Sequence, residues 1–131
     1  MRIVHRKAAE SGGGEALGPY RIESLISEAE EGRFTAYRVR VEPGQTTGES
    51  YHKLAEELYF VLEGSGLAVL DGEERRLEAG DFLRLPPGTR HRFVTDDQPL
   101  VMLDVHSPGS RPNRDVYFTG ETPAGFAAGA E

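Results

Sequence analysis

The chain has 131 residues, which fits one domain and leaves no room for two domains of ordinary size. It has no cysteine, so structural cysteine–zinc sites, iron–sulfur clusters and thiol catalysis are excluded. Acidic residues outnumber basic ones by 22 to 15, the opposite of the balance in proteins that bind a phosphate backbone, so we expect no nucleic-acid partner. No apolar run approaches ~18 residues and the first residues lack an apolar signal region, so we expect a cytoplasmic protein with no membrane partner.

Both ends of the chain are expected to lie outside the folded unit. Three consecutive glycines at 12–14 cannot hold a fixed backbone without a large entropic cost, so 1–18 are predicted to form a flexible N-terminal arm. The stretch 121–131, which is rich in alanine and glycine, is predicted to be a frayed C-terminal tail. The folded domain is therefore expected over 19–120.

Between these ends, the spacing of glycine and proline predicts many short strands. Glycine and proline recur roughly every eight to twelve residues, a spacing typical of a sandwich or a barrel. Asp71-Gly72 is a strong hairpin signal between alternating segments, and turns are also expected at 64–66 and 86–88. The expected strands, in chain order, are 20–26, 34–41, 58–62, 67–70, 74–77, 82–85, 91–95 and 100–105.

The segment 51–61 is ambiguous by pattern alone. Tyr51, Leu54 and Leu58 recur at helical spacing, and the residues between them include good helix formers. The aromatic and β-branched run at 59–61 favours a strand instead. Sequence pattern leaves both interpretations open here.

The histidines are the candidate functional residues. His52 lies close to Glu57 in the sequence, and His91 follows a sharp turn. Two neutral imidazoles and one carboxylate suit a divalent first-row metal ion. Taken singly, a histidine is more often structural or exposed than a ligand, so residue types alone are a weak signal.

The spacing around His52 resembles a motif of the cupin superfamily. Gly44 is followed by five residues, then Ser50-Tyr51-His52, four residues, Glu57, six residues and Gly64. The first cupin motif is similar: G, five residues, H-x-H, three or four residues, E, six residues, G. Ser50 stands where that motif has its first histidine.

A second segment resembles the second cupin motif. Gly80 is followed by five residues, then Pro86-Pro87-Gly88, two residues and His91. The family pattern is G, five residues, P-x-G, two residues, H, three residues, N, and Thr95 replaces its final asparagine. Two motifs of fixed spacing in the right order are far more specific than either motif alone.

The resemblance implies an all-β fold, a single-domain cupin β-barrel of the double-stranded β-helix or jelly-roll type. In such a barrel, residues alternate between lumen and exterior. A turn within 53–56 would place Glu57 on a new strand and return it to the lumen, so the resemblance overrules the helical interpretation of 51–61.

The resemblance also implies a metal site in the lumen. Of the family's ligands, His52, Glu57 and His91 carry over, which leaves a 2-His-1-carboxylate site for a divalent metal ion such as Fe, Zn, Mn, Ni or Cu. Ser50 is a weak ligand and is expected to mark an open coordination side. Tyr59 and Phe93 share the parity of these ligands and are expected to line the pocket, although packing in the core is equally consistent with their positions.

Two further expectations rest on strand parity. In 100–105, Val101, Leu103 and Val105 are expected to face the lumen because they are apolar, which would place Asp104 and His106 on the exterior. Leu58, Phe60 and Leu62 have the opposite parity to the lumen face. An exposed apolar strip of this kind favours association, and we expect a homodimer.

Two functions fit these residues. The first is a small metal-dependent cupin enzyme, of the oxygenase, isomerase, lyase or cyclase type, that acts on an organic small molecule. The alternative is a non-catalytic cupin that binds a small molecule without a functional metal. Fold resemblance alone does not choose between them.

Overall fold

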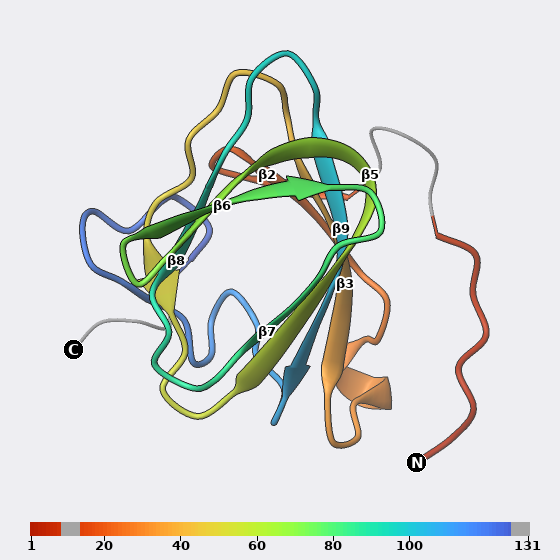
Figure 1. Ribbon diagram of the computed structural model, residues 1–131. Helices are drawn as coiled ribbons and strands as arrows, with labels where there is room; N and C mark the ends of the chain where they lie inside the picture. Colours follow the sequence, from red (N-terminus) through yellow and green to blue (C-terminus); the bar gives the residue numbers. More distant parts are fainter. Residues whose placement is uncertain (9–13, 127–131) are drawn as a thin grey trace.

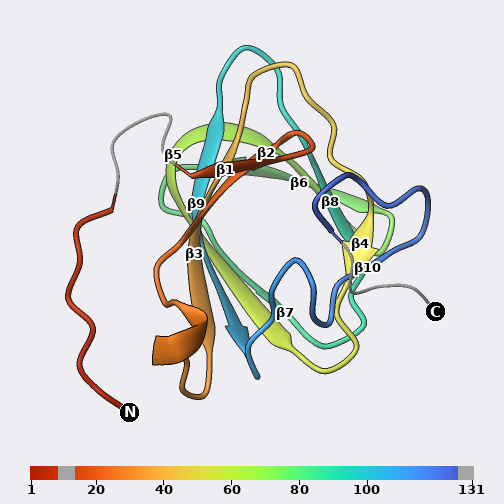
Figure 2. The same ribbon diagram turned by 180° about the vertical axis from the view of Figure 1, so that it is seen from behind.

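The barrel is built almost entirely from antiparallel strands that curl around a central lumen (Figures 1 and 2). The computed structural model describes residues 1–8 and 14–126. The described strands are β1 (Glu15–Leu17), β2 (Tyr20–Ser24), β3 (Thr35–Val41), β4 (Ser50–Tyr51), β5 (Glu56–Leu70), β6 (Glu73–Glu78), β7 (Phe82–Leu85), β8 (His91–Val94), β9 (Leu100–Ser107) and β10 (Tyr117–Phe118). One short 3-10 helix, η1 (Glu28–Glu30), lies between β2 and β3. Within the described residues, no helix is long and apolar enough to cross a membrane.

Strand β5 holds the two halves of the barrel together. The strands follow the order β1-β2-β3-β9-β5-β8-β4-β10, and β6 and β7 also pair with β5. The first part of β5 pairs with β7 and β9, whereas its second part pairs with β6 and β8. The segment 51–61 is therefore not helical, and the expected cupin-type barrel is confirmed.

The turn expected at 64–66 is absent, because a β-bulge replaces it. The expected strands 58–62 and 67–70 form the single strand β5, whose register against β9 shifts between Val61 and Glu63. Gly64 follows this shift with a φ of 85°, and a Cβ at this position would collide with the carbonyl oxygen of Pro99. The bulge bends the strand, and the extra residue changes which side chains face inward.

The burial pattern records this change of face. Before the bulge, Glu57, Tyr59 and Val61 are buried, whereas after it Gly66, Ala68 and Val69 are, and of these Ala68 belongs to the central core cluster. Because the side-chain period of a strand is two, one inserted residue exchanges the faces from that point onward. Both halves of β5 therefore present side chains to the same lumen.

Strand β9 corrects the expectation for Asp104 and His106. Both side chains face the lumen, and their backbone partners across the sheet are Tyr59 and Glu57 respectively. The prediction from parity was wrong because it took the more apolar face of β9 to be the inner one.

The outer face of this sheet is also apolar. Leu103 on β9 lies opposite Phe60 on β5, which in turn lies opposite Phe82 on β7. Phe60 and Phe82 are 40% and 59% exposed, and the neighbouring Leu62 is 46% exposed. An apolar strip therefore crosses three strands on the exterior, and the expectation of a homodimer rests on it.

Parts of both predicted ends pack against the barrel, whereas 1–8 form no strand or helix and are mostly exposed. Strand β1 falls within the range expected to form an arm, yet it pairs with β2 and buries Leu17. Phe126 falls within the expected tail, yet its ring centroid lies 6.4 Å from that of Tyr20 and 5.1 Å from that of Phe118. The remaining parts of both predicted ends, at 9–13 and 127–131, lie outside the described residues.

The bulge yields a prediction about stability. Gly64→Ala should lower the free energy of unfolding by more than about 3 kcal/mol, because it adds a backbone collision to the strain of a positive φ. Gly72 has a similar φ of 83°, but a Cβ added there would have no atom within 4 Å, so Gly72→Ala should cost only about 1 kcal/mol. Urea denaturation of both variants measures the difference, and equal costs would contradict the role given to Gly64.

The apolar strip yields a prediction about assembly. Light scattering at micromolar concentration should give wild-type particles near twice the 14.4 kDa mass of one chain. Phe60→Glu should return the mass to that of one chain, because it places a charge in the centre of the strip. Arg75→Glu on exposed β6 is the control and should leave the mass unchanged. A wild-type protein of single-chain mass would refute the expectation.

Candidate metal centre

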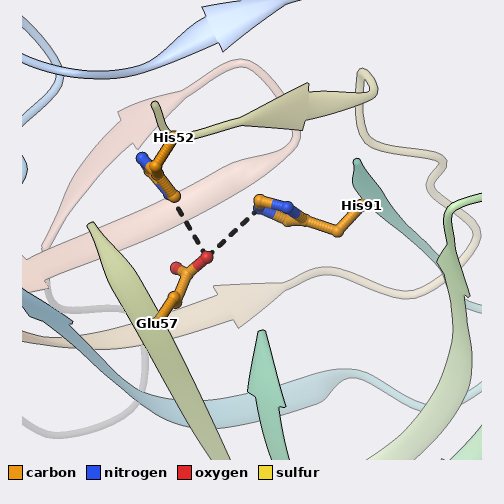
Figure 3. A group of neighbouring side chains, drawn as sticks. All are labelled: His52, Glu57 and His91. Carbon is orange, nitrogen blue, oxygen red and sulfur yellow. Dashed lines mark ion pairs between the residues drawn. The ribbon is translucent and has the colours of Figure 1, made fainter. Parts of the chain in front are cut away.

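The centre of the lumen is a buried carboxylate surrounded by three imidazoles. The Oε1 atom of Glu57 lies 3.2 Å from Nε2 of His52 and 3.4 Å from Nε2 of His91, and these three side chains point toward one another (Figure 3). The Oε2 atom of Glu57 lies 2.7 Å from Nε2 of His106. All four side chains are buried, and Glu57 is only 2% exposed. Four segments of chain, around β4, β5, β8 and β9, supply this cluster.

A distant aspartate holds the turn that carries His52. The carboxylate of Asp115 accepts hydrogen bonds from the backbone N–H groups of Lys53, Leu54 and Ala55. The carbonyl oxygen of Asp115 accepts a hydrogen bond of 2.5 Å from Nδ1 of His52. This arrangement fixes both the turn expected within 53–56 and the orientation of the imidazole ring.

The other two imidazoles are oriented in the same way. Nδ1 of His91 lies 3.1 Å from the carbonyl oxygen of Thr89, and Nδ1 of His106 lies 3.4 Å from Oγ1 of Thr35. Metal-binding histidines commonly donate one ring N–H to such an oxygen, which fixes the tautomer and turns the other nitrogen toward the ion. In all three rings here, Nε2 is the nitrogen that faces Glu57.

The residues present fit a divalent metal ion. Oε1 of Glu57 is buried and has no hydrogen-bond partner among the described residues, although two imidazole nitrogens lie close to it. A buried carboxylate oxygen without a hydrogen bond is costly, and a cation shared with the two nitrogens would remove that cost. One ligand atom each from His52, Glu57 and His91 can be chosen so that all lie within 4.8 Å of one another, and the same holds for Glu57, Asp104 and His106.

Burial and neighbouring charges shift the pKa values of the cluster in different directions. Burial opposes the charge of Glu57, but the neighbouring imidazoles, that of His106 foremost, outweigh it and hold the pKa of Glu57 well below its ordinary value. Burial lowers the pKa of His91, which keeps this ring neutral. Burial alone would lower the pKa of His52, but Glu57 raises it above the ordinary 6.5. Burial and then the charge of Glu57 raise the pKa of Asp104 well above its ordinary value, which favours its protonated form.

A cavity of about 60 Å³ adjoins the cluster. Aromatic side chains form much of its wall, namely Tyr20, Tyr37, Tyr59, Phe118 and Phe126. Ser50 also lines it, with Oγ 3.4 Å from Nε2 of His91. Phe93 packs in the core instead, against Tyr59 at a centroid distance of 5.1 Å.

Three residues of the site were not recognised as such from the sequence. Asp104 and His106 were expected on the exterior, and Asp115 was not singled out at all. Asp104 and His106 alternate along β9 in step with Leu100 and Met102, which are buried. This shared parity with apolar residues is the signal that could have placed Asp104 and His106 in the lumen. Asp115 lies 63 residues from His52 along the chain, and no local pattern connects them.

Comparisons with known proteins agree with this architecture. The cupin domain family matches residues 37–106. The tetracenomycin polyketide synthase protein TcmJ of Streptomyces glaucescens is 31% identical over 109 residues, which are 80% of this chain and 73% of that protein. Quercetin 2,3-dioxygenase of Bacillus subtilis is 32% identical over 79 residues, which are 60% of this chain but only 23% of that enzyme. The chain thus spans about a quarter of the dioxygenase.

A solved structure extends the agreement to the fold. The cupin 2 conserved barrel domain protein from Salinispora arenicola superposes with a TM-score of 0.69 and 25% identity, over 81% of this chain and 90% of that chain. The family match covers more than half of the chain and includes all four residues of the cluster. The chain is therefore a member of the cupin family.

Proposed function

We propose that the protein is a metal-dependent cupin enzyme that acts on an organic small molecule in the lumen of the barrel. Its metal ligands would be His52, Glu57 and His91. The observation that carries the proposal is the unpartnered Oε1 of Glu57, which two imidazole Nε2 atoms face while their Nδ1 atoms are held by backbone oxygens.

The residues around the ligands suit a small organic substrate. A divalent ion bound here would supply Lewis acidity toward substrate oxygen atoms. Tyr59 lines the cavity, and burial followed by the charges of Asp104 and Glu57 raises the pKa of its phenol well above the ordinary value. The phenol therefore keeps its proton at neutral pH and can donate a hydrogen bond to a substrate. The aromatic wall excludes water and packs against an apolar substrate skeleton.

The named relatives include an enzyme and a polyketide synthase protein, which supports an enzymatic function for this chain. Quercetin 2,3-dioxygenase and the polyketide synthase protein TcmJ are both relatives of this chain. For this chain we propose a reaction of the oxygenase, isomerase, lyase or cyclase type, with Fe, Zn, Mn, Ni or Cu as the metal. The fold supports many chemistries, so the ligands and the cavity wall select the reaction.

A non-catalytic small-molecule binder is the second candidate. Its support is the 2.7 Å contact between Oε2 of Glu57 and Nε2 of His106, since a protonated imidazole there balances the carboxylate without a metal. Ser50 in place of a motif histidine is consistent with the same function. Metal content distinguishes the two candidates.

The first test of the proposal is metal binding itself. Purified wild-type protein should bind one equivalent of divalent metal, measured by mass spectrometry after dialysis. The double variant His52→Ala/His91→Ala should lose the metal, whereas His5→Ala, at an exposed position, should retain it. Equal retention in wild type and the double variant would refute the ligand assignment.

The pH dependence of metal binding follows from the histidines. A ligating imidazole must be neutral, so protons compete with the metal as the pH falls. Because Glu57 raises the pKa of His52 above 6.5, this ring should take up its proton first, and metal affinity should already decline on acidification from neutral pH. Titration calorimetry between pH 5 and pH 8 measures the metal affinity at each pH. A roughly constant affinity over this range would contradict the prediction.

Ser50 offers a gain-of-ligand test. Ser50→His adds an imidazole beside His91, so it should tighten metal binding while it blocks an open position for small molecules. The measurements are metal affinity and binding of the bidentate probe catechol to the metal-loaded protein, for wild type and variant. A variant that binds metal no more tightly, or catechol equally well, would show that Ser50 does not border the open side.

A further inference from the structure

His106 is a third histidine in the cluster, and neither cupin motif includes it. It lies on β9, directly opposite Glu57 on β5, and is 5% exposed. Its ring centroid is 4.6 Å from that of His52. The lumen therefore contains as many imidazoles as a complete cupin site, although Ser50 replaces the first histidine of the motif.

The surroundings of His106 determine where its ring proton lies. Thr35 donates its hydroxyl proton to the carbonyl oxygen of Ser110 at 3.0 Å, and its Oγ1 accepts the N–H of Ser110 at 3.0 Å. Oγ1 has no second proton to donate, so toward Nδ1 of His106, at 3.4 Å, it can only accept. In this arrangement the proton of a neutral His106 lies on Nδ1.

This tautomer leaves the lone pair of Nε2 directed at Oε2 of Glu57. A nitrogen lone pair and an ionised carboxylate oxygen at 2.7 Å repel each other unless a cation joins them. A second proton is one such cation, and a divalent metal is another. The neighbouring Oδ1 of Asp104 lies 3.7 Å from the same nitrogen, which is too far for a hydrogen bond. The carboxylate of Glu57 is therefore the group in direct contact with Nε2.

We propose that His106 is the fourth protein ligand of the metal and replaces the imidazole that the first motif lacks at Ser50. The inference rests on the proposed function, because it assumes that a metal binds at Glu57. The ligand set then becomes His52, Glu57, His91 and His106, with Glu57 shared between the two groups of neighbouring ligand atoms. The coordination side next to Ser50 stays open, since His106 reaches the site from β9 and Ser50 from β4.

The experiment uses the full chain and Zn²⁺ alone. The affinity for Zn²⁺, measured by competition with a chromophoric chelator, is compared among wild type, His106→Gln, His106→Ala and the control His5→Gln. Glutamine retains an N–H that can hydrogen-bond to Glu57 but is a poor ligand. We expect both His106 variants to lose affinity by more than about 100-fold, beyond the 10–100-fold typical of losing an outer hydrogen bond, while His5→Gln matches wild type.

A second readout needs no variant. In wild-type protein with ¹⁵N-labelled histidine, saturation with Zn²⁺ should shift the Nε2 resonances of three histidines and leave those of the exposed His5 unchanged. Moving the ligand provides a rescue: adding Ser50→His to His106→Ala should recover much of the lost affinity. This rescue distinguishes a ligand from a residue needed only for folding.

The outcomes separate the two proposals. If His106→Gln binds Zn²⁺ within a few-fold of wild type and only two histidine Nε2 resonances shift, His106 merely orients Glu57 and the inference is overturned while the metal site stands. If wild-type protein binds no divalent metal, the proposed function itself fails. If His106→Ala does not fold, His106→Gln and the wild-type resonances decide the question.

Discussion

The buried negative charge of Glu57 is the constraint on which the rest of the lumen depends. An ion removed from water costs several kcal/mol unless partners in good geometry compensate for it. The compensating imidazoles come from the end of β4, from β8 and from β9, so the charge is balanced only when the barrel has closed. Oxygens of Asp115, Thr89 and Thr35 then orient the three rings. Burial and charge balance thus make the cluster a consequence of the fold.

Strand β5 connects this cluster to the architecture. It carries Glu57 near its start and pairs with β6, β7, β8 and β9 along its 15 residues. The bulge before Gly64 allows one strand to belong to both halves of the barrel, because it bends the backbone and exchanges its faces. A strand without the bulge would turn Ala68 outward and bring its larger neighbours Leu67 and Val69 into the core. The position of the carboxylate and the closure of the barrel therefore depend on the same local irregularity.

The chemistry of the site depends on which cation joins Glu57 to its imidazoles. A proton on His106 leaves a structural ion pair and a lumen suited to binding alone, whereas a divalent metal gives a centre with an open side next to Ser50. Both states would use the same side chains. The aromatic wall, which includes the protonated phenol of Tyr59, is suited to a small organic molecule in either case.

The spacing of glycine and proline predicted most of the strands, and the resemblance of two motifs to the cupin family implied the turn within 53–56 and the grouping of His52, Glu57 and His91. Only the tertiary structure decided the rest. The parity of β9 could not be read, since both of its faces are apolar: one packs in the core, and the other forms the exposed strip with Phe60 and Phe82. The position of the bulge could not be predicted either, because the composition of the sequence does not indicate where a strand gains one extra residue. His106 and Asp115 reach the site through cross-strand register and a long connection, and such contacts arise from closure of the barrel, which no window of sequence contains.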